Sequence, residues 1–211
     1  MTDIAGAGKH YNDAADRVIG LDGKRYCSNH ATIWRWRDAY QNDFAARMQW
    51  TMSPDFSTAN HAPVVKLNGT EGPVPLYLEV EAGEEILLDA SGTYDPDGGD
   101  LTFQWFQYKD VTATQWWVDA EVKDVQFQKQ DNEGRVVKIQ LPPADACAVD
   151  LFTRQPVKRG QILHFILTVQ DNGMPPLTTY RRAVVQVTNH ELKGGGGRAV
   201  ECIAEVAHEE R

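Results

Sequence analysis

Cysteine is scarce in this chain of 211 residues, and its three cysteines lie far apart. Cys27, Cys147 and Cys202 fit no metal-ligand spacing, and an odd number cannot all pair within one chain. We expect free or partly buried thiols, with one disulfide beside one free thiol as the alternative. The cysteines therefore predict neither a structural metal site nor a disulfide framework.

Long apolar runs and a basic excess are also absent. No run approaches the roughly 20 residues of a membrane span, so we expect no membrane partner. The chain has 30 acidic and 21 basic residues, a formal net charge of -9, which repels phosphate backbones and argues against nucleic acid. The N-terminus has no basic start followed by an apolar core. We therefore expect either a cytoplasmic chain or one whose secretory signal, and even an upstream domain, lies outside this sequence.

Signatures of catalysis are missing as well. The sequence has no GxSxG elbow, phosphate-binding loop or dinucleotide glycine pattern. No two of the six histidines share a metal-ligand spacing, and no carboxylate pair stands out as an acid–base couple. We expect a chain that is not an enzyme. A glycoside-active enzyme with an unrecognised carboxylate pair remains a minor alternative.

A helical period is present before residue 52. From Thr32, side chains recur at three- and four-residue steps and predict a helix that ends before Pro54. The members of this face are Ile33, Trp36, Tyr40, Phe44, Arg47 and Met48. Such a face must pack on the domain that follows or on a domain absent from this chain. A shorter helix is also expected at residues 13–20.

After a linker at residues 53–62, short alternating segments replace the helical period. Their number, and the lack of helices between them, predict a mainly β fold, an immunoglobulin-like antiparallel β-sandwich at residues 63–192. An N-terminal helical segment (1–52) precedes it, and a glycine-rich hinge and tail (193–211) follow. Trp105 is expected in the core. Strands are expected at residues 64–69, 76–80, 84–89, 101–108, 115–118, 122–127, 135–141, 162–170 and 181–188, with a helical turn at 144–149.

An acidic loop at residues 92–100 is the first candidate site. It gathers Asp95, Asp97 and Asp100 around one proline and two glycines. In an immunoglobulin-like sandwich the loop at residues 171–177 lies at the same end, which brings Asp171 close. Calcium binds six to eight oxygens in flexible geometry, so these four carboxylates predict a calcium site. The alternative is that they only form turns and cap loops.

Aromatic residues near the fourth strand are the second candidate site. Tyr94, Tyr108, Trp116 and Trp117 are candidates for a flat surface that stacks on sugar rings, with Gln104 among the polar neighbours. Adjacent tryptophans on a strand point to opposite faces, so one of the pair is expected to be exposed or covered by another segment. The alternative is that these rings serve internal packing.

Two sequence blocks carry a family resemblance. The first is IWRWRDAYQNDFAARMQWT at residues 33–51, followed by NHAPVVKLNG at 60–69. The second is LDASGTYDPDGGDLTFQWFQY at 88–108, with LHFILTVQDNGMPPLTTYRRAVVQV at 163–187. Over roughly residues 25–190 the chain resembles the C-terminal region of cellulose-binding proteins that carry an N-terminal nucleoside-hydrolase-like domain. The DPDG turn also resembles polycystic-kidney-disease-type and cadherin-like modules.

The resemblance implies a binding role. It implies a non-catalytic carbohydrate-binding module for polysaccharide, cellulose or a related glucan, in a secreted or cell-surface setting. The hydrolase-like domain and its Asp-rich metal site are not in this sequence, and residues 1–52 resemble its tail and joining helix. The alternative is a structural accessory domain whose helix docks on an upstream hydrolase-like domain or mediates oligomer contacts.

Overall fold

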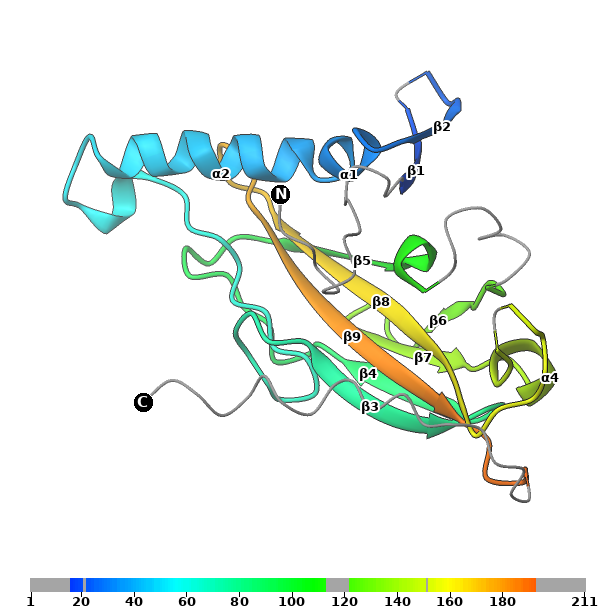
Figure 1. The fold of residues 1–211 in the computed structure, drawn as a ribbon. Helices are drawn as coiled ribbons and strands as arrows, with labels where there is room; N and C mark the ends of the chain where they lie inside the picture. Colours follow the sequence, from blue (N-terminus) through cyan, green and yellow to red (C-terminus); the bar gives the residue numbers. More distant parts are fainter. Residues whose placement is uncertain (1–15, 21, 113–121, 151, 193–211) are drawn as a thin grey trace, which may run out of the picture.

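The fold is mainly β, as predicted (Figure 1). A computed structural model describes residues 16–20, 22–112, 122–150 and 152–192. Its strands are β1 (Asp16–Ile19), β2 (Arg25–Ser28), β3 (Leu76–Glu81), β4 (Glu85–Asp89), β5 (Leu101–Gln107), β6 (Phe127–Lys129), β7 (Val136–Gln140), β8 (Arg159–Asp171) and β9 (Thr178–Thr188). Its helices are α1 (Ala31–Trp34), α2 (Arg37–Trp50) and α4 (Ala144–Cys147), with single 3-10 turns at Phe56–Thr58 and Lys109–Val111.

Two sheets form the body of the protein. One has the strand order β3-β9-β8-β5, and the other has the order β4-β7-β6. All neighbours are antiparallel except β3 and β9, which are parallel. The structure thus departs from the fully antiparallel prediction at this one pair. The connection from β3 to β9 passes through five other strands, which gives the chain the length a parallel return requires.

The core lies between these two sheets. Leu88 and Ile139 of the three-stranded sheet share a buried cluster with Phe165 and Val185 of the four-stranded sheet. Trp105 on β5 is partly buried against this cluster, and its indole Nε1 donates to the Gly134 carbonyl oxygen at 2.9 Å, so it links the two sheets. The alternation along β8 places Leu163, Phe165 and Leu167 inward, as predicted.

Three local predictions fail or shift. Asp16–Ile19 was expected in a helix but forms β1, because its main chain pairs with β2 from Asp16–Ser28 to Ile19–Arg25. The segment 64–69 makes only isolated bridges, Val64 to Tyr94 and Leu67 to Thr70. β6 starts at the last residue of the predicted strand 122–127, and the predicted strand 115–118 lies outside the described residues. The helical turn near residue 144 is confirmed as α4.

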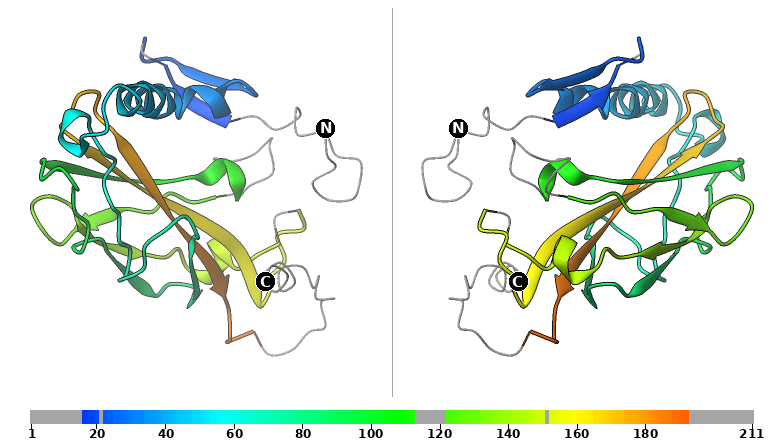
Figure 2. Two further views of the ribbon diagram at one scale, coloured as in Figure 1. Left: turned by 90° about the vertical axis from the view of Figure 1, so that its left-hand side faces the viewer. Right: turned by 90° about the vertical axis from the view of Figure 1, so that its right-hand side faces the viewer.

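Helix α2 covers the outer face of the four-stranded sheet, opposite the three-stranded sheet (Figures 1 and 2). Ala46 is buried, the Asn42 amide donates to the Pro176 carbonyl at 3.0 Å, and the Trp50 indole donates to the Asn60 carbonyl at 2.9 Å. Tyr40, Phe44 and Met48, however, are 48, 66 and 54% exposed. The helix is confirmed, but most of its aromatic face points away from the sheet.

Cys27 is exposed and Cys147 is buried, and both are free thiols. Burial raises the pKa of the Cys147 thiol to about 11, which keeps it protonated and unreactive at neutral pH. Within the described residues, the helices are too short or too polar to span a bilayer.

His164 makes the stability of the fold dependent on pH. Its ring is buried on β8, and Arg182 donates to its Nδ1 at 3.1 Å. Burial, and secondly the Arg182 charge, lower the pKa of His164 to about 4 from 6.5. In the unfolded chain His164 therefore binds a proton near pH 6.5, whereas in the folded chain it binds one only near pH 4. This residue's contribution to stability is complete above pH 6.5 and is lost as the pH falls toward 4.

We predict that His164→Gln removes part of this acid sensitivity. From pH 7 to pH 4 the wild type should lose about 3 kcal/mol more free energy of unfolding than the variant. Chemical denaturation at a series of pH values measures the difference. Parallel pH profiles of the two proteins would contradict the assignment.

Candidate functional site

The acidic loop is stabilised by hydrogen bonds within the loop and by hydrogen bonds to the linker. Asp95 Oδ1 accepts from the main-chain nitrogens of Asp97 and Gly99 at 2.7 and 3.2 Å, an Asx-type turn. The Asp97 carboxylate accepts from the main-chain nitrogen of His61 at 2.6 Å and lies 3.0 Å from its Nδ1. The His61 ring stacks between Phe56 and Trp50, with centroid distances of 3.6 and 5.5 Å. Asp97 therefore connects the loop to the end of helix α2.

The two acidic loops do converge, as the topology predicted. Asn172 joins them, since its Oδ1 accepts from the Asp100 main-chain nitrogen at 3.1 Å. Asp171 is buried and accepts from the Asn60 amide at 3.0 Å and from the main-chain nitrogens of Gly173 and Leu177 at 2.9 Å. Asn60 fills the space that a side chain at Gly173 would need. A linker residue thus occupies the position between the loops.

The described residues contain no group of three or more His, Cys, Asp or Glu side chains placed to hold a metal ion. Most oxygens of Asp95, Asp97 and Asp171 accept hydrogen bonds from the protein itself. The exception within the described residues is Asp95 Oδ2, which is buried without a partner. The geometry therefore suits turn formation, and calcium binding remains a prediction.

The four predicted aromatic residues lie in different surroundings. Tyr94 is 51% exposed, beside Val64 in the acidic loop. Tyr108 is half-buried: its hydroxyl donates to Asp16 Oδ2 at 2.7 Å, and the Arg35 guanidinium lies 4.8 Å from its ring centroid. Burial, and then the Asp16 bond, raise the pKa of Tyr108. Trp116 and Trp117 lie outside the described residues, so the aromatic surface stays a prediction.

A buried ionic cluster covers Tyr108. Arg35 Nε lies 3.3 Å from Asp16 Oδ2, and Arg35 Nη2 lies 3.2 Å from Asp110 Oδ2. Arg17 Nη1 lies 3.2 Å from Asp110 Oδ1. Burial, and secondly the Asp16 charge, raise the pKa of Asp110 against the opposing effect of the arginines. Two carboxylates and two guanidinium groups thus balance here and fasten β1 and α1 to the end of β5.

Beside this cluster, Trp36 makes a second contact between the N-terminal segment and the sheet. Its ring lies 4.9 Å from Tyr180 and 6.0 Å from both Phe106 and Tyr108, measured between centroids. The contacts to Tyr180 and Tyr108 are edge-to-face, which suits the ring quadrupoles. The part of the sheet under Trp36 is therefore aromatic and covered.

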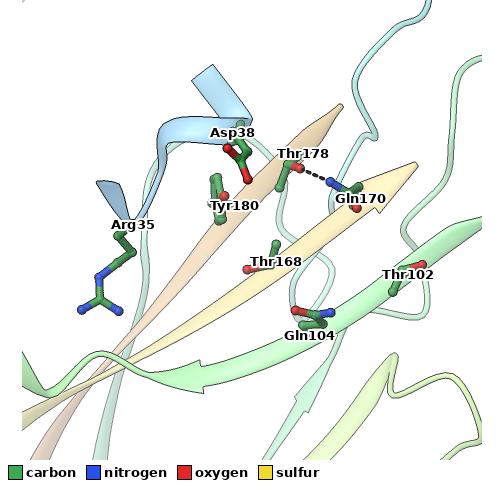
Figure 3. Close-up of a pocket in the computed structure, with 9 residues that line it drawn as sticks. Arg35, Asp38, Thr102, Gln104, Thr168, Gln170, Thr178 and Tyr180 are labelled. Carbon is green, nitrogen blue, oxygen red and sulfur yellow. Dashed lines mark hydrogen bonds between the residues drawn. The ribbon is translucent and has the colours of Figure 1, made fainter. Parts of the chain in front are cut away.

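A polar pocket of about 190 Å³ lies next to this covered part, between the start of α2 and the outer face of the sheet (Figure 3). Strands β5, β8 and β9 form its floor, and the helical segment forms its wall. Its lining residues are Arg35, Asp38, Ala39, Thr102, Gln104, Thr168, Gln170, Thr178 and Tyr180. Of these residues, only Gln104 was predicted from the sequence as part of a site. The available signal was the alternation of Thr and Gln with apolar residues along β5 and β8.

Comparisons with known proteins identify the region that runs from β4 into β9. Residues 85–187 match the model of the family described as cellulose-binding protein Sde0182, C-terminal domain. No curated protein matches the chain.

Among solved structures, the chain is similar to a nucleoside hydrolase-related hypothetical protein from Saccharophagus degradans that is associated with carbohydrate metabolism. The identity is 30% and the TM-score 0.61, over 82% of this chain and 40% of that one. This chain thus spans less than half of that protein. Human CDH23 EC21-23 and mouse cadherin-23 EC22-24 align at 16 and 17% identity, with TM-scores of 0.35 and 0.36. These two alignments cover 60 and 61% of this chain and 33% of each cadherin chain.

The family match falls on the second of the two blocks that carry the sequence resemblance, and the similarity to the Saccharophagus structure extends over most of the chain. The resemblance of this chain to the C-terminal region of this cellulose-binding protein family, predicted from those blocks, is thereby confirmed over residues 85–187.

Proposed function

We propose that this chain is a non-catalytic carbohydrate-binding module with an immunoglobulin-like sandwich. The observation that carries the proposal is the match of residues 85–187 to the C-terminal domain of a cellulose-binding protein. The similar Saccharophagus protein is associated with carbohydrate metabolism, which points the same way. The ligand is a polysaccharide, with cellulose preferred among glucans, and the setting is secreted or cell-surface.

The proposed binding surface consists of the predicted aromatic residues. Flat rings stack on the apolar C–H faces of pyranose rings. Tyr94 supports this role because half of its surface is exposed. Trp116 and Trp117 are the strongest candidates by residue type, since tryptophan offers the largest flat face. Tyr108 takes part only if a ligand reaches it beside Arg35.

The aromatic surface predicts a loss of cellulose binding on truncation. Trp116→Ala/Trp117→Ala and Tyr94→Ala should each lower retention on insoluble cellulose about tenfold, equivalent to about 1.4 kcal/mol. Tyr77→Ala is the matched control, because Tyr77 is 64% exposed on β3 but is not part of the proposed surface. Pull-down with depletion isotherms measures the affinities. If the wild type and the three variants bind insoluble cellulose equally, the aromatic residues do not form the binding surface.

Calcium binding at Asp95, Asp97, Asp100 and Asp171 is a separate proposal. A bound ion would use the free Asp95 Oδ2 and would replace contacts that Asn60 and His61 now make. Calcium at a hundredfold excess over its Kd should then raise the Tm by about 5–10 °C, because it binds only the folded state. Asp100→Asn should reduce this rise, whereas Asp145→Asn, at an exposed aspartate outside the loops, should not. If calcium leaves the Tm unchanged, the proposal that these aspartates bind calcium is wrong.

A second candidate function is a structural accessory domain. The observation that favours it is the exposure of Tyr40, Phe44 and Met48, which form one stripe along α2 at four-residue steps. Exposed apolar stripes of this kind mark protein contact surfaces. The similar Saccharophagus protein is more than twice as long as the aligned part and is related to nucleoside hydrolases. We propose that the stripe contacts a hydrolase-like domain.

The stripe predicts binding in trans. The part of the Saccharophagus protein that this chain does not cover, produced separately, should bind the chain, and Phe44→Gln/Met48→Gln should weaken binding at least tenfold. Gln41→Glu and Gln49→Glu are control variants on the same helix. Titration calorimetry measures the affinities. No binding by the wild type, or equal binding by the stripe variant, would count against this function.

A further inference from the structure

The outer face of the four-stranded sheet divides into a covered and an open part. The covered part holds Phe106 and Ile166, which pair across β5 and β8, and Trp36 packs on it. The open part holds two further rows of side chains on the same face. Their members are Thr102, Gln170 and Thr178 in one row and Gln104, Thr168 and Tyr180 in the other, and Tyr180 lies at the boundary with the covered part, in contact with Trp36. Every member of these rows carries a hydroxyl or an amide.

These polar groups have unused hydrogen-bonding capacity. The Gln170 amide donates to the Thr178 hydroxyl at 3.1 Å. The side chains of Thr102, Gln104 and Thr168 make no hydrogen bond within the part of the chain that the structure describes. Amides and hydroxyls both donate and accept, as sugar hydroxyls do. Figure 3 shows these side chains on the strands beneath the helical wall.

The charges around the pocket exclude anions. Among the described residues that line the pocket, Arg35 is the one basic residue, and Asp16 and Asp110 already neutralise its guanidinium. Asp38 contributes a carboxylate at the rim. A phosphate or carboxylate ligand would meet this negative charge without an unpaired cation among the described residues that line the pocket. The pocket therefore suits a neutral polyhydroxyl ligand.

The size of the pocket limits the ligand to a single ring. Its volume of about 190 Å³ is below the roughly 300–1,000 Å³ of sites that hold drug-sized ligands. Ala39 keeps the space open, because its methyl group is the smallest side chain on the helical wall. Tyr180 adds an aromatic ring to the floor, and this ring packs on Trp36 at 4.9 Å between centroids.

We infer that the polar pocket is a subsite for one pyranose ring, the end of a glucan chain, separate from the exposed aromatic surface. The inference rests on the proposed carbohydrate-binding function and deepens it. A flat aromatic surface holds the side of a chain, whereas the pocket recognises hydroxyls at its end. Gln104, Thr168 and Gln170 bind the hydroxyls, and Asp38 accepts from one at the rim.

Binding of cellohexaose by titration calorimetry tests the subsite. Ala39→Leu fills the pocket and Gln104→Leu removes an amide from its floor, so each should weaken cellohexaose binding at least tenfold. Gln128→Leu is the matched control, because Gln128 is exposed on β6 in the other sheet. It should bind as the wild type does. Circular dichroism and Tm values establish that all variants are folded.

The outcomes separate the two proposals. If the wild type binds cellohexaose and both pocket variants bind it equally well, the subsite is wrong and the carbohydrate-binding function stands. If the wild type binds neither cellohexaose nor insoluble cellulose, the function itself fails, and the subsite fails with it. Loss of binding in both pocket variants, with Gln128→Leu unaffected, supports the subsite.

Discussion

Arg35 holds the N-terminal segment on the sheet. The polar pocket and the exposed apolar stripe of α2 both depend on this contact. Its guanidinium contacts Asp16, 19 residues before it, and Asp110, 75 residues after it. Burying these charges costs solvation, and the ion pairs of Arg35 with Asp16 and Asp110 and of Arg17 with Asp110 offset that cost. Once the segment is fixed, α2 presents its polar side to the pocket and its apolar stripe to the surroundings. The inferred pyranose subsite and the proposed protein contact therefore use opposite sides of one helix and are compatible.

At the two acidic loops, the polar side chains form hydrogen bonds that stabilise the loops themselves. Four aspartates in two converging loops form a pattern that in sequence suggests a cation. In the structure, Asn60 and His61 reach between the loops and bind Asp171 and Asp97. A carboxylate that accepts several main-chain N–H groups is already satisfied, so a cation must compete with them. The linker joins the loops through these hydrogen bonds.

The fold was predictable where the pattern is local and repeated. The alternation in residues 162–170 specifies β8, because every second side chain faces the core. The convergence of the acidic loops followed from topology alone. β1 was not predictable in the same way, because a four-residue strand is stabilised by its partner β2 and not by its own periodicity. The parallel pairing of β3 with β9 likewise depends on contacts between distant segments.

The candidate site was less predictable than the fold, since it depends on which faces are covered. The sequence marks Tyr108 as an aromatic strand residue, but only the docking of Arg35 and Asp16 covers its ring. The same docking leaves Gln104 and Thr168 open, each two residues along its strand from the covered pair Phe106 and Ile166. A polar residue on an outward strand face has no distinctive pattern until a second element forms a wall beside it. The wall here comes from residues 35–39, which are over 60 residues distant, so the pocket exists only in the folded chain.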